Sequence, residues 1–324
     1  MKIAIDRAWR YQGLTYPNPA VGALIIKDGR ILALGAHERA GKMHAELACA
    51  RDAYVRMGGD RAVLESDDPS FVYEFLLKNA GSMFKGAQIF VTLEPCTHYG
   101  RTPPCSLLIE GLGFSRVVIA HEDFNEQAGG GAKALGKKCE VVVGVCREEA
   151  AKLLYPFKAW SENRFVLFKL AQTLNGKIAP GTISSLKSRE FVHRLRDRAD
   201  LLIIGGDTVR ADRPVLDARL CGGRAPDVMI VSSRDDFDRE IPLFSVPDRE
   251  VFVSNEISIP KRYRYVLIEG GEGMLKKSAS IVDWYLFFVS SRTGKSRGYD
   301  FDSCGEFLHC SKIGDDIAIW RENG

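Results

Sequence analysis

Apolar and polar positions along the first half of the chain follow two periods, one typical of strands and one typical of helices. Strand-length apolar runs occupy residues 21–26, 31–36, 87–93, 116–120 and 140–145. Stretches with helical spacing occupy residues 1–13, 44–57 and 105–112. The sequence KDGR at 27–30 favours a tight hairpin turn between the first two strands. Strands and helices that alternate at these lengths predict a three-layer α/β sandwich.

The pattern restarts in the second half, after a charged helix predicted over 147–160. A second helix is predicted over 185–198, followed by a strand and a loop rich in Asp and Arg. Strand-length runs occupy residues 166–171, 200–206, 228–233, 251–255, 265–271, 285–291 and 316–320. A chain of 324 residues exceeds what one hydrophobic core usually serves. We therefore predict two α/β domains, residues 1–146 and 147–324.

Composition narrows the class of protein. Hydrophobic residues make up 45% of the chain and charged residues 27%, which is ordinary for a globular protein. The formal net charge of +3 gives no electrostatic reason to expect a nucleic-acid or membrane partner. The N-terminal stretch has no apolar run of signal-peptide length, so we expect a cytoplasmic protein. The 8 cysteines are then expected to be thiols and metal ligands, not disulfides.

The candidate chemistry of the first half lies in two short motifs, HAE at 44–46 and EPCTHYGRTPPC at 94–105. They contribute the imidazole of His44 and the thiols of Cys96 and Cys105. Three such ligands suit a zinc site that keeps its fourth position open for water. Zinc nucleobase deaminases carry H-x-E followed by P-C-x-x-C, whereas here the gap between the cysteines is stretched.

Glu46 is the fourth group of this set and is predicted to move protons. It lies two residues after His44, an offset that points side chains of a helix in different directions. A carboxylate that is not a ligand can transfer a proton between water and a leaving group. Cys49 follows one turn later on the same predicted helix, and we interpret it as a core thiol.

Two segments of the first half resemble a known enzyme family. The sequence YPNPAVGALIIKDGRILALGAHERAGKMHAE, followed by TLEPCTHYGRTPPC, resembles the deaminase half of the bifunctional riboflavin-biosynthesis deaminase–reductases. That family joins a cytidine-deaminase-like domain to a dihydrofolate-reductase-like domain. The resemblance implies that His44, Cys96 and Cys105 bind zinc and that Glu46 is catalytic. It implies the substrate 2,5-diamino-6-ribosylamino-4(3H)-pyrimidinone 5′-phosphate, which loses a ring amino group as ammonia.

Three further residues flank these motifs. Asn18 is held between two prolines, and we favour a substrate contact for it over the alternative of a turn asparagine. His37 and His98 are candidates for substrate contact as well. For His98, an exposed loop residue is an equal alternative.

The second half lacks the G-x-G-x-x-G and Walker patterns of nucleotide-binding loops. Its segments KLAQTLNGKIA, GGDTVRADRP and IEGGEGML resemble the reductase half of the same family. The resemblance implies an NADPH site and a substrate site. The cofactor residues would be Ala171, Thr208, Asp212, Ser233, Gly271, Glu272 and Gly273. The substrate residues would be Arg196, Leu216, Arg219 and Glu269, with the arginines on the phosphate. Lys169 and Asp212 are candidates for proton transfer.

Some residues of the second half have a plainer alternative. Asp212 could pair with Arg210 or Arg213, and Arg196 could belong to a solvated helix face. Two segments are shorter than is usual in the family, the loop at 179–184 and the stretch after Asp217. In the first half, residues 65–86 form an insertion that we expect to contain an extra helix.

The sequence therefore predicts a bifunctional enzyme that uses zinc for hydrolytic deamination and NADPH to reduce the ribosyl group to a ribityl chain. The expected partner is a small pyrimidine ribosyl phosphate, with no nucleic acid and no membrane, in a homo-oligomer. The alternative is a nucleoside or tRNA-base deaminase whose C-terminal domain serves only for binding or oligomerisation.

Overall fold

The computed structural model describes residues 1–100, 103–124, 129–178 and 181–324. Contacts between residues divide the chain into two compact units, Met1–Lys158 and Ala159–Gly324. The division falls inside helix α6, Arg147–Glu162, and the domain boundary that we placed before this helix stays a prediction. Within the described residues, none of the helices has the length and apolar character needed to cross a membrane.

The first unit is built on a five-stranded sheet with the order β2-β1-β3-β4-β5. Its strands are β1 (Gly22–Lys27), β2 (Arg30–Ala36), β3 (Gln88–Leu93), β4 (Arg116–His121) and β5 (Glu140–Val143). β1 is antiparallel to both β2 and β3, whereas β3, β4 and β5 run parallel. The predicted hairpin is confirmed: Asp28 and Gly29 both have positive φ, at 50° and 72°, as its tight turn requires.

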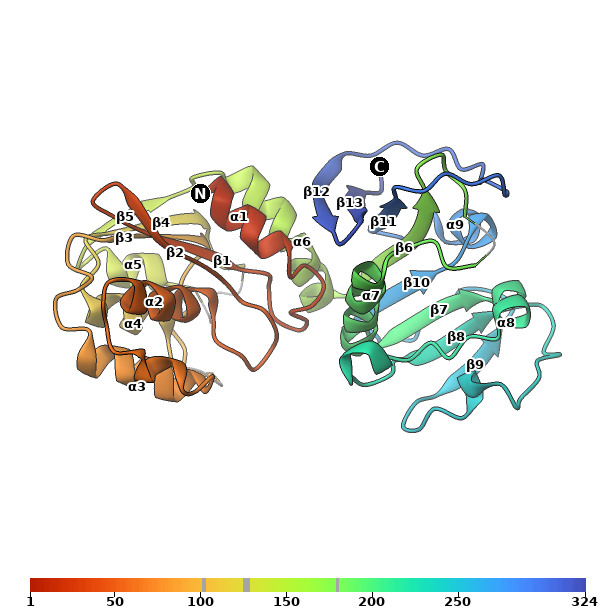
Figure 1. Cartoon of the computed structure of the whole chain (residues 1–324), viewed down its shortest axis with the longest axis horizontal. Helices are drawn as coiled ribbons and strands as arrows, with labels where there is room; N and C mark the ends of the chain where they lie inside the picture. Colours follow the sequence, from red (N-terminus) through yellow and green to blue (C-terminus); the bar gives the residue numbers. More distant parts are fainter. Residues whose placement is uncertain (101–102, 125–128, 179–180) are drawn as a thin grey trace. The chain divides into compact units, whose positions relative to one another are not determined.

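Helices cover both faces of this sheet (Figure 1), as the predicted three-layer sandwich requires. They are α1 (Lys2–Trp9), α2 (Ala45–Arg56), α3 (Pro69–Asn79), α4 (Cys105–Leu112), α5 (Gly131–Leu135) and the first part of α6. Two glycines set the close approach of helices to strands. A Cβ on Gly22 would lie 2.0 Å from the carbonyl oxygen of Ala4 in α1, and one on Gly35 would lie 2.8 Å from that of Ala45 in α2. The start of α2 is thereby held close to the sheet.

The extra helix expected within the insertion is α3. Asp68 caps its first turn by accepting a hydrogen bond of 2.8 Å from the Phe71 N–H, and Pro69 occupies the first turn. Val72 and Leu76 are fully buried in the core of the unit. The insertion is therefore an integral part of the hydrophobic core.

The second unit contains an eight-stranded sheet with the order β12-β13-β11-β6-β10-β7-β8-β9 (Figure 1). Its strands are β6 (Phe165–Thr173), β7 (Leu201–Gly205), β8 (Asp227–Val231), β9 (Val251–Ser254), β10 (Tyr265–Glu269), β11 (Trp284–Ser290), β12 (Phe307–Ile313) and β13 (Asp316–Glu322). The six strands from β11 to β9 run parallel, and β13 and β12 add antiparallel pairs. Carboxyl ends of parallel strands meet at one edge of the sheet, where ligands usually bind in such folds.

The helices of this unit are α7 (Leu186–Arg198), α8 (Gly206–Asp212) and α9 (Glu272–Ser278). Two elements differ from the expectations. The segment expected to be a loop rich in Asp and Arg begins with α8, whose N-cap is Gly205, the last residue of β7. Strand β12 was not predicted, because exposed and half-buried residues are mixed along it at the sheet edge and it lacks a continuous apolar run.

The packing of α3 makes a prediction about stability. Leu76 is 0% exposed and its neighbour Leu77 is 40% exposed. We expect Leu76→Ala to lower the free energy of unfolding of this unit by about 2–5 kcal/mol, because it leaves a cavity in the core. Leu77→Ala, the matched control, should cost less than about 1 kcal/mol. Equal losses from the two variants in urea denaturation would contradict the packing of α3.

Candidate metal centre and the sheet edge of the second unit

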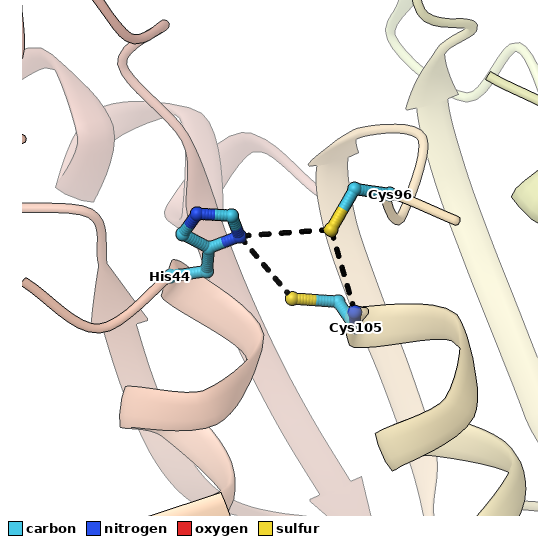
Figure 2. A group of neighbouring side chains, drawn as sticks. All are labelled: His44, Cys96 and Cys105. Atoms are coloured by element: carbon cyan, nitrogen blue, oxygen red, sulfur yellow. Dashed lines mark hydrogen bonds between the residues drawn. The ribbon is translucent and has the colours of Figure 1, made fainter. Parts of the chain in front are cut away.

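Three predicted ligands come together in the first unit (Figure 2). His44 is the N-cap of α2, Cys105 is the first residue of α4, and Cys96 lies three residues beyond the end of β3. The Nδ1 atom of His44 lies 3.7 Å from Sγ of Cys96 and 3.4 Å from Sγ of Cys105. The three ligand atoms all lie within 4.8 Å of one another.

These distances fit a tetrahedral zinc ion. Zn–N and Zn–S bonds of about 2.0–2.3 Å place neighbouring ligand atoms about 3.3–3.8 Å apart. One imidazole and two thiols are also the donor set that zinc favours. Among the described residues, this is the one cluster of three or more His, Cys, Asp or Glu side chains that could hold a metal ion.

The surroundings of the two cysteines favour a thiolate. The backbone N–H of Cys105 donates a hydrogen bond of 3.4 Å to Sγ of Cys96. The hydrogen bond between the two side chains lowers the pKa of Cys96 to about 4, against the effect of burial, and raises that of Cys105. The pair thus shares one proton, which a metal cation would displace.

Glu46 lies in the first turn of α2, beside the ligands, and is 4% exposed. Burial raises its pKa to about 6, and the nearby His44 opposes this shift. A carboxyl group with a pKa near neutrality can both take up and release a proton, as a proton shuttle requires. The position and environment of Glu46 therefore agree with its predicted role.

A cavity of about 440 Å³ opens beside the three ligands within the first unit. It is lined by the predicted substrate residues Asn18 and His37, by Glu46, and by His98 at its exposed side. The cavity has the size expected of a small-molecule site.

Asn18 and His37 form a connected pair. Nδ1 of His37 lies 2.9 Å from the carbonyl oxygen of Met43, which can only accept, so Nδ1 carries the proton. Nε2 then accepts the hydrogen bond of 3.1 Å from Nδ2 of Asn18. Burial lowers the pKa of His37 to about 4, so the ring is neutral at pH 7. The orientation of the Asn18 amide at the cavity is thereby fixed.

The cavity also has lining residues that the sequence analysis did not name as site residues: Lys42, Glu94, Asp123 and Phe157. Glu94 stands inside the quoted EPC motif, two residues before Cys96, so its position was a usable signal. Phe157 belongs to α6 and carries no local signal, because only the tertiary structure brings it to the cavity.

Cys49 is fully buried in the core, where burial raises its pKa, in agreement with a core thiol.

In the second unit, three predicted residues form a buried ionic cluster. Glu269, at the end of β10, is 7% exposed. Its carboxylate accepts two hydrogen bonds from Arg196, at 2.7 and 3.0 Å, and one from Lys169 at 3.0 Å. Burial raises the pKa of Glu269, but the two cations outweigh this effect and hold it well below its usual range. The solvated-face alternative for Arg196 is excluded by this burial and pairing.

The other predicted substrate residues, Leu216 and Arg219, flank Asp217, whose carbonyl oxygen contacts the cluster. Arg196 also donates to the carbonyl oxygen of Asp217 at 3.3 Å, and Arg219 pairs with the Asp217 carboxylate at 2.6 Å. Leu216 adopts a left-handed conformation with a φ of 57°, and its carbonyl oxygen accepts a hydrogen bond of 2.9 Å from Arg249. Because Glu269 already occupies the guanidinium fork of Arg196, the phosphate contact of Arg196 stays a prediction.

The predicted cofactor residues follow the carboxyl ends of parallel strands. Ala171 lies near the end of β6 and Ser233 just after β8, while Thr208 and Asp212 belong to α8 after β7. Gly271, Glu272 and Gly273 follow β10, where Gly271 caps α9. The strand order places β6, β10, β7 and β8 side by side, so these segments share one sheet edge. This arrangement fits a nucleotide cofactor.

The residues that follow β7 and β10 differ in whether they have room or free polar groups for a ligand. A Cβ on Gly206 would lie 2.6 Å from Ser232, and one on Gly270 would lie 2.6 Å from Met274, so these glycines serve internal packing. Gly273 faces open space, which leaves room for a ligand. Glu272 is paired with Lys276 and Arg297, both at 2.8 Å.

The structure does not pair Asp212 with Arg210 or Arg213, which was the alternative to a cofactor contact. Arg210 pairs with Asp207 and Asp236, and Arg213 pairs with Asp238.

The shortened loop at 179–184 lies partly outside the described residues, because 179 and 180 do not belong to them.

Two family models match separate stretches of the chain. Residues 1–121 match the family described as the cytidine and deoxycytidylate deaminase zinc-binding region, and residues 164–284 match the RibD C-terminal domain. The riboflavin biosynthesis protein RibD of Aquifex aeolicus is 39% identical over 252 residues, which cover 75% of this chain and 62% of that protein. RibD of Synechocystis is 35% identical over 254 residues, covering 75% and 61%.

A solved structure is similar over the whole chain. It is the diaminohydroxyphosphoribosylaminopyrimidine deaminase/5-amino-6-(5-phosphoribosylamino)uracil reductase of Thermotoga maritima, at 29% identity and a TM-score of 0.64. The alignment covers 100% of this chain and 97% of that one. In the sequence comparisons, the chain spans about six tenths of the length of the curated relatives that it matches.

The fold and the site together define a two-domain protein in which a zinc-binding, deaminase-type α/β sandwich precedes a reductase-type α/β domain. This is the fold class predicted from the sequence, and it is confirmed. The chain belongs to the RibD family of riboflavin-biosynthesis proteins.

The metal centre makes a prediction about zinc content. We expect Cys96→Ala to weaken zinc binding by more than the roughly 10–100-fold that changes around the ligands cause, because it removes a ligand itself. Cys49→Ala is the matched control and should keep one zinc ion per chain. Zinc content and competition with a chelator measure both. Unchanged zinc affinity in Cys96→Ala would contradict the assignment of the ligands.

Proposed function

We propose that this protein is a bifunctional enzyme of riboflavin synthesis. It deaminates 2,5-diamino-6-ribosylamino-4(3H)-pyrimidinone 5′-phosphate in its first domain and reduces the ribosyl group of the product with NADPH in its second. The observation that carries the proposal is the meeting of His44, Cys96 and Cys105 within 4.8 Å beside a cavity lined by Glu46. Membership of the RibD family supports the choice of substrate.

In the first domain, His44, Cys96 and Cys105 would hold zinc. When bound, this ion lowers the pKa of a water molecule in its open position and so supplies a nucleophile near neutral pH. Glu46 would take a proton from the attacking water and deliver it to the ring amino group that leaves as ammonia. Asn18, oriented by its hydrogen bond to His37, contacts the pyrimidine ring.

In the second domain, Ala171, Thr208, Asp212, Ser233 and residues 271–273 would line NADPH, which supplies the hydride for C1′ of the ribose. Their common position at the carboxyl edge of the parallel strands supports this assignment. The substrate lies near Leu216, Arg219, Glu269 and the predicted contact Arg196.

The ionic cluster suggests how the charged residues divide their roles. The side chain of Arg219 is 58% exposed, against 12% for Arg196, and its ion pair with Asp217 lies at the surface, so Arg219 is better placed to meet the phosphate. Arg196 holds Glu269 in a fixed orientation through two hydrogen bonds. Lys169 donates a hydrogen bond of 3.0 Å to Glu269 and is the candidate in this cluster for a proton transfer to the opening ring.

A second candidate function is an active deaminase whose C-terminal domain only binds or oligomerises. It is favoured by the ion pairs that already occupy two predicted ligand contacts, Arg196 with Glu269 and Glu272 with Lys276. The two functions differ in whether the purified protein oxidises NADPH.

The deaminase assignment is tested with Glu46→Gln. We expect this variant to bind zinc as the wild type does, because Glu46 is not a ligand. Deamination should fall by about 10²–10⁴, the usual contribution of general acid–base catalysis. Ammonia release from the diamino substrate and zinc content are measured on one preparation. Deamination at the wild-type rate would overturn the role of Glu46.

The reductase assignment is tested with the same variant. Supplied with the deaminated substrate, 5-amino-6-(5-phosphoribosylamino)uracil, Glu46→Gln should oxidise NADPH as fast as the wild type. Supplied with the diamino substrate, only the wild type should do so, because it alone produces the deaminated compound. The loss of absorbance of NADPH measures both. No oxidation by folded wild-type protein with the deaminated compound would favour the binding-domain alternative.

A further inference from the structure

A second buried glutamate, Glu94, begins the ligand loop, which we define as residues 94–97. Glu94 is 8% exposed and lines the cavity. Its carboxylate accepts three backbone hydrogen bonds: Oε2 from the N–H of Asp123 at 3.1 Å, and Oε1 from those of Gly130 and Ala132 at 3.1 and 2.8 Å. All three donors lie between the end of β4 and the first turn of α5. One side chain therefore ties the main chain of Asp123, Gly130 and Ala132 to the ligand loop.

Two further contacts join the same segments. The hydroxyl of Thr97 donates a hydrogen bond of 2.9 Å to the carbonyl oxygen of Gly129. A Cβ on Gly131 would lie 2.0 Å from the carbonyl oxygen of Pro95, so only glycine permits this approach. The ligand loop and residues 129–132 are thus packed backbone against backbone, with the Glu94 carboxylate between them.

The position of Cys96 depends on these contacts, because the regular strand β3 ends at Leu93. On one side, Cys96 is held by α4: the Cys105 N–H donates to its Sγ at 3.4 Å, and the Ser106 N–H donates to its carbonyl oxygen at 3.1 Å. On the other side, the contacts of Glu94 and its neighbours hold the loop. Metal–ligand distances in a well-formed site lie within about 0.2 Å of their standard values, so the site needs Cys96 to be held in place.

We propose that Glu94 is a positioning residue of the metal centre. Its carboxylate anchors residues 129–132 and the main chain of Asp123 to the ligand loop, and this anchoring holds Cys96 at metal-binding distance from His44 and Cys105. The inference rests on the proposed function for the metal that the site holds. Glu94 differs from Glu46 because it acts through Cys96 and not on the substrate.

Glu94→Gln tests this role. An amide offers one acceptor oxygen, so at least one backbone N–H then faces an NH₂ group. We expect zinc affinity to fall about 10–100-fold, the usual effect of changes around metal ligands. In the zinc-free protein, hydrogen exchange of the Asp123 amide should accelerate, because the single acceptor oxygen keeps two hydrogen bonds by facing Gly130 and Ala132. Deamination should return when zinc exceeds the new Kd, since Glu46 is intact.

Glu110→Gln is the matched control, because Glu110 lies on α4 with Cys105 but pairs at the surface with Lys138 at 2.9 Å. It should change none of these quantities. Gly131→Ala disturbs the same contact from the opposite segment and should also weaken zinc binding, which covers the case in which Glu94→Gln fails to fold.

Wild-type zinc affinity and amide exchange in both Glu94→Gln and Gly131→Ala would overturn the inference. Deamination by Glu94→Gln that stays low at saturating zinc would also overturn it, because a positioning role predicts recovery. The zinc and exchange measurements need no substrate. A wild-type protein that binds zinc but deaminates nothing would count against the proposed function, while weaker zinc binding in Glu94→Gln would still support the role of Glu94.

Discussion

The first unit depends on one constraint: an imidazole and two thiols from separate segments must meet within 4.8 Å. All three stand where regular structure begins or ends, with His44 and Cys105 at the starts of α2 and α4 and Cys96 beyond β3. Backbone N–H groups at a helix start lack partners within the helix and favour negative charge. The start of α4 thus stabilises the Cys96 thiolate through the Cys105 N–H, and the sheet fixes where the helices begin.

The same logic sets the close contacts elsewhere in this unit. Gly22 and Gly35 let α1 and α2 approach the strands, and a Cβ on Gly35 would lie 2.8 Å from the carbonyl oxygen of Ala45, directly after the ligand His44. In the second unit, the comparable constraint is electrostatic. Glu269 is buried, and a buried carboxylate without partners is costly, so Arg196 and Lys169 must both face it. The charges of these three residues therefore organise this part of the sheet.

The sequence was sufficient for features that depend on local chemistry. The predicted strands, the Asp28–Gly29 turn, the insertion helix α3 and the ligands of the metal centre all follow from short patterns. The sequence was insufficient for features that depend on contacts between segments distant in the chain. Strand β12 lacks a continuous apolar run, Phe157 reaches the cavity only through α6, and the pairing of Arg196 with Glu269 joins residues 73 positions apart.

Glu46 and Glu94 show why residue type and burial alone do not define a role. Both are less than 10% exposed, and both line one cavity. Burial raises the pKa of Glu46 to about 6, so its proton can be exchanged near neutral pH. The oxygens of Glu94 instead accept three backbone N–H groups, and these bonds commit the carboxylate to holding the chain. Hydrogen-bond donors around each carboxylate thus separate the group that moves protons from the group that holds a ligand in place.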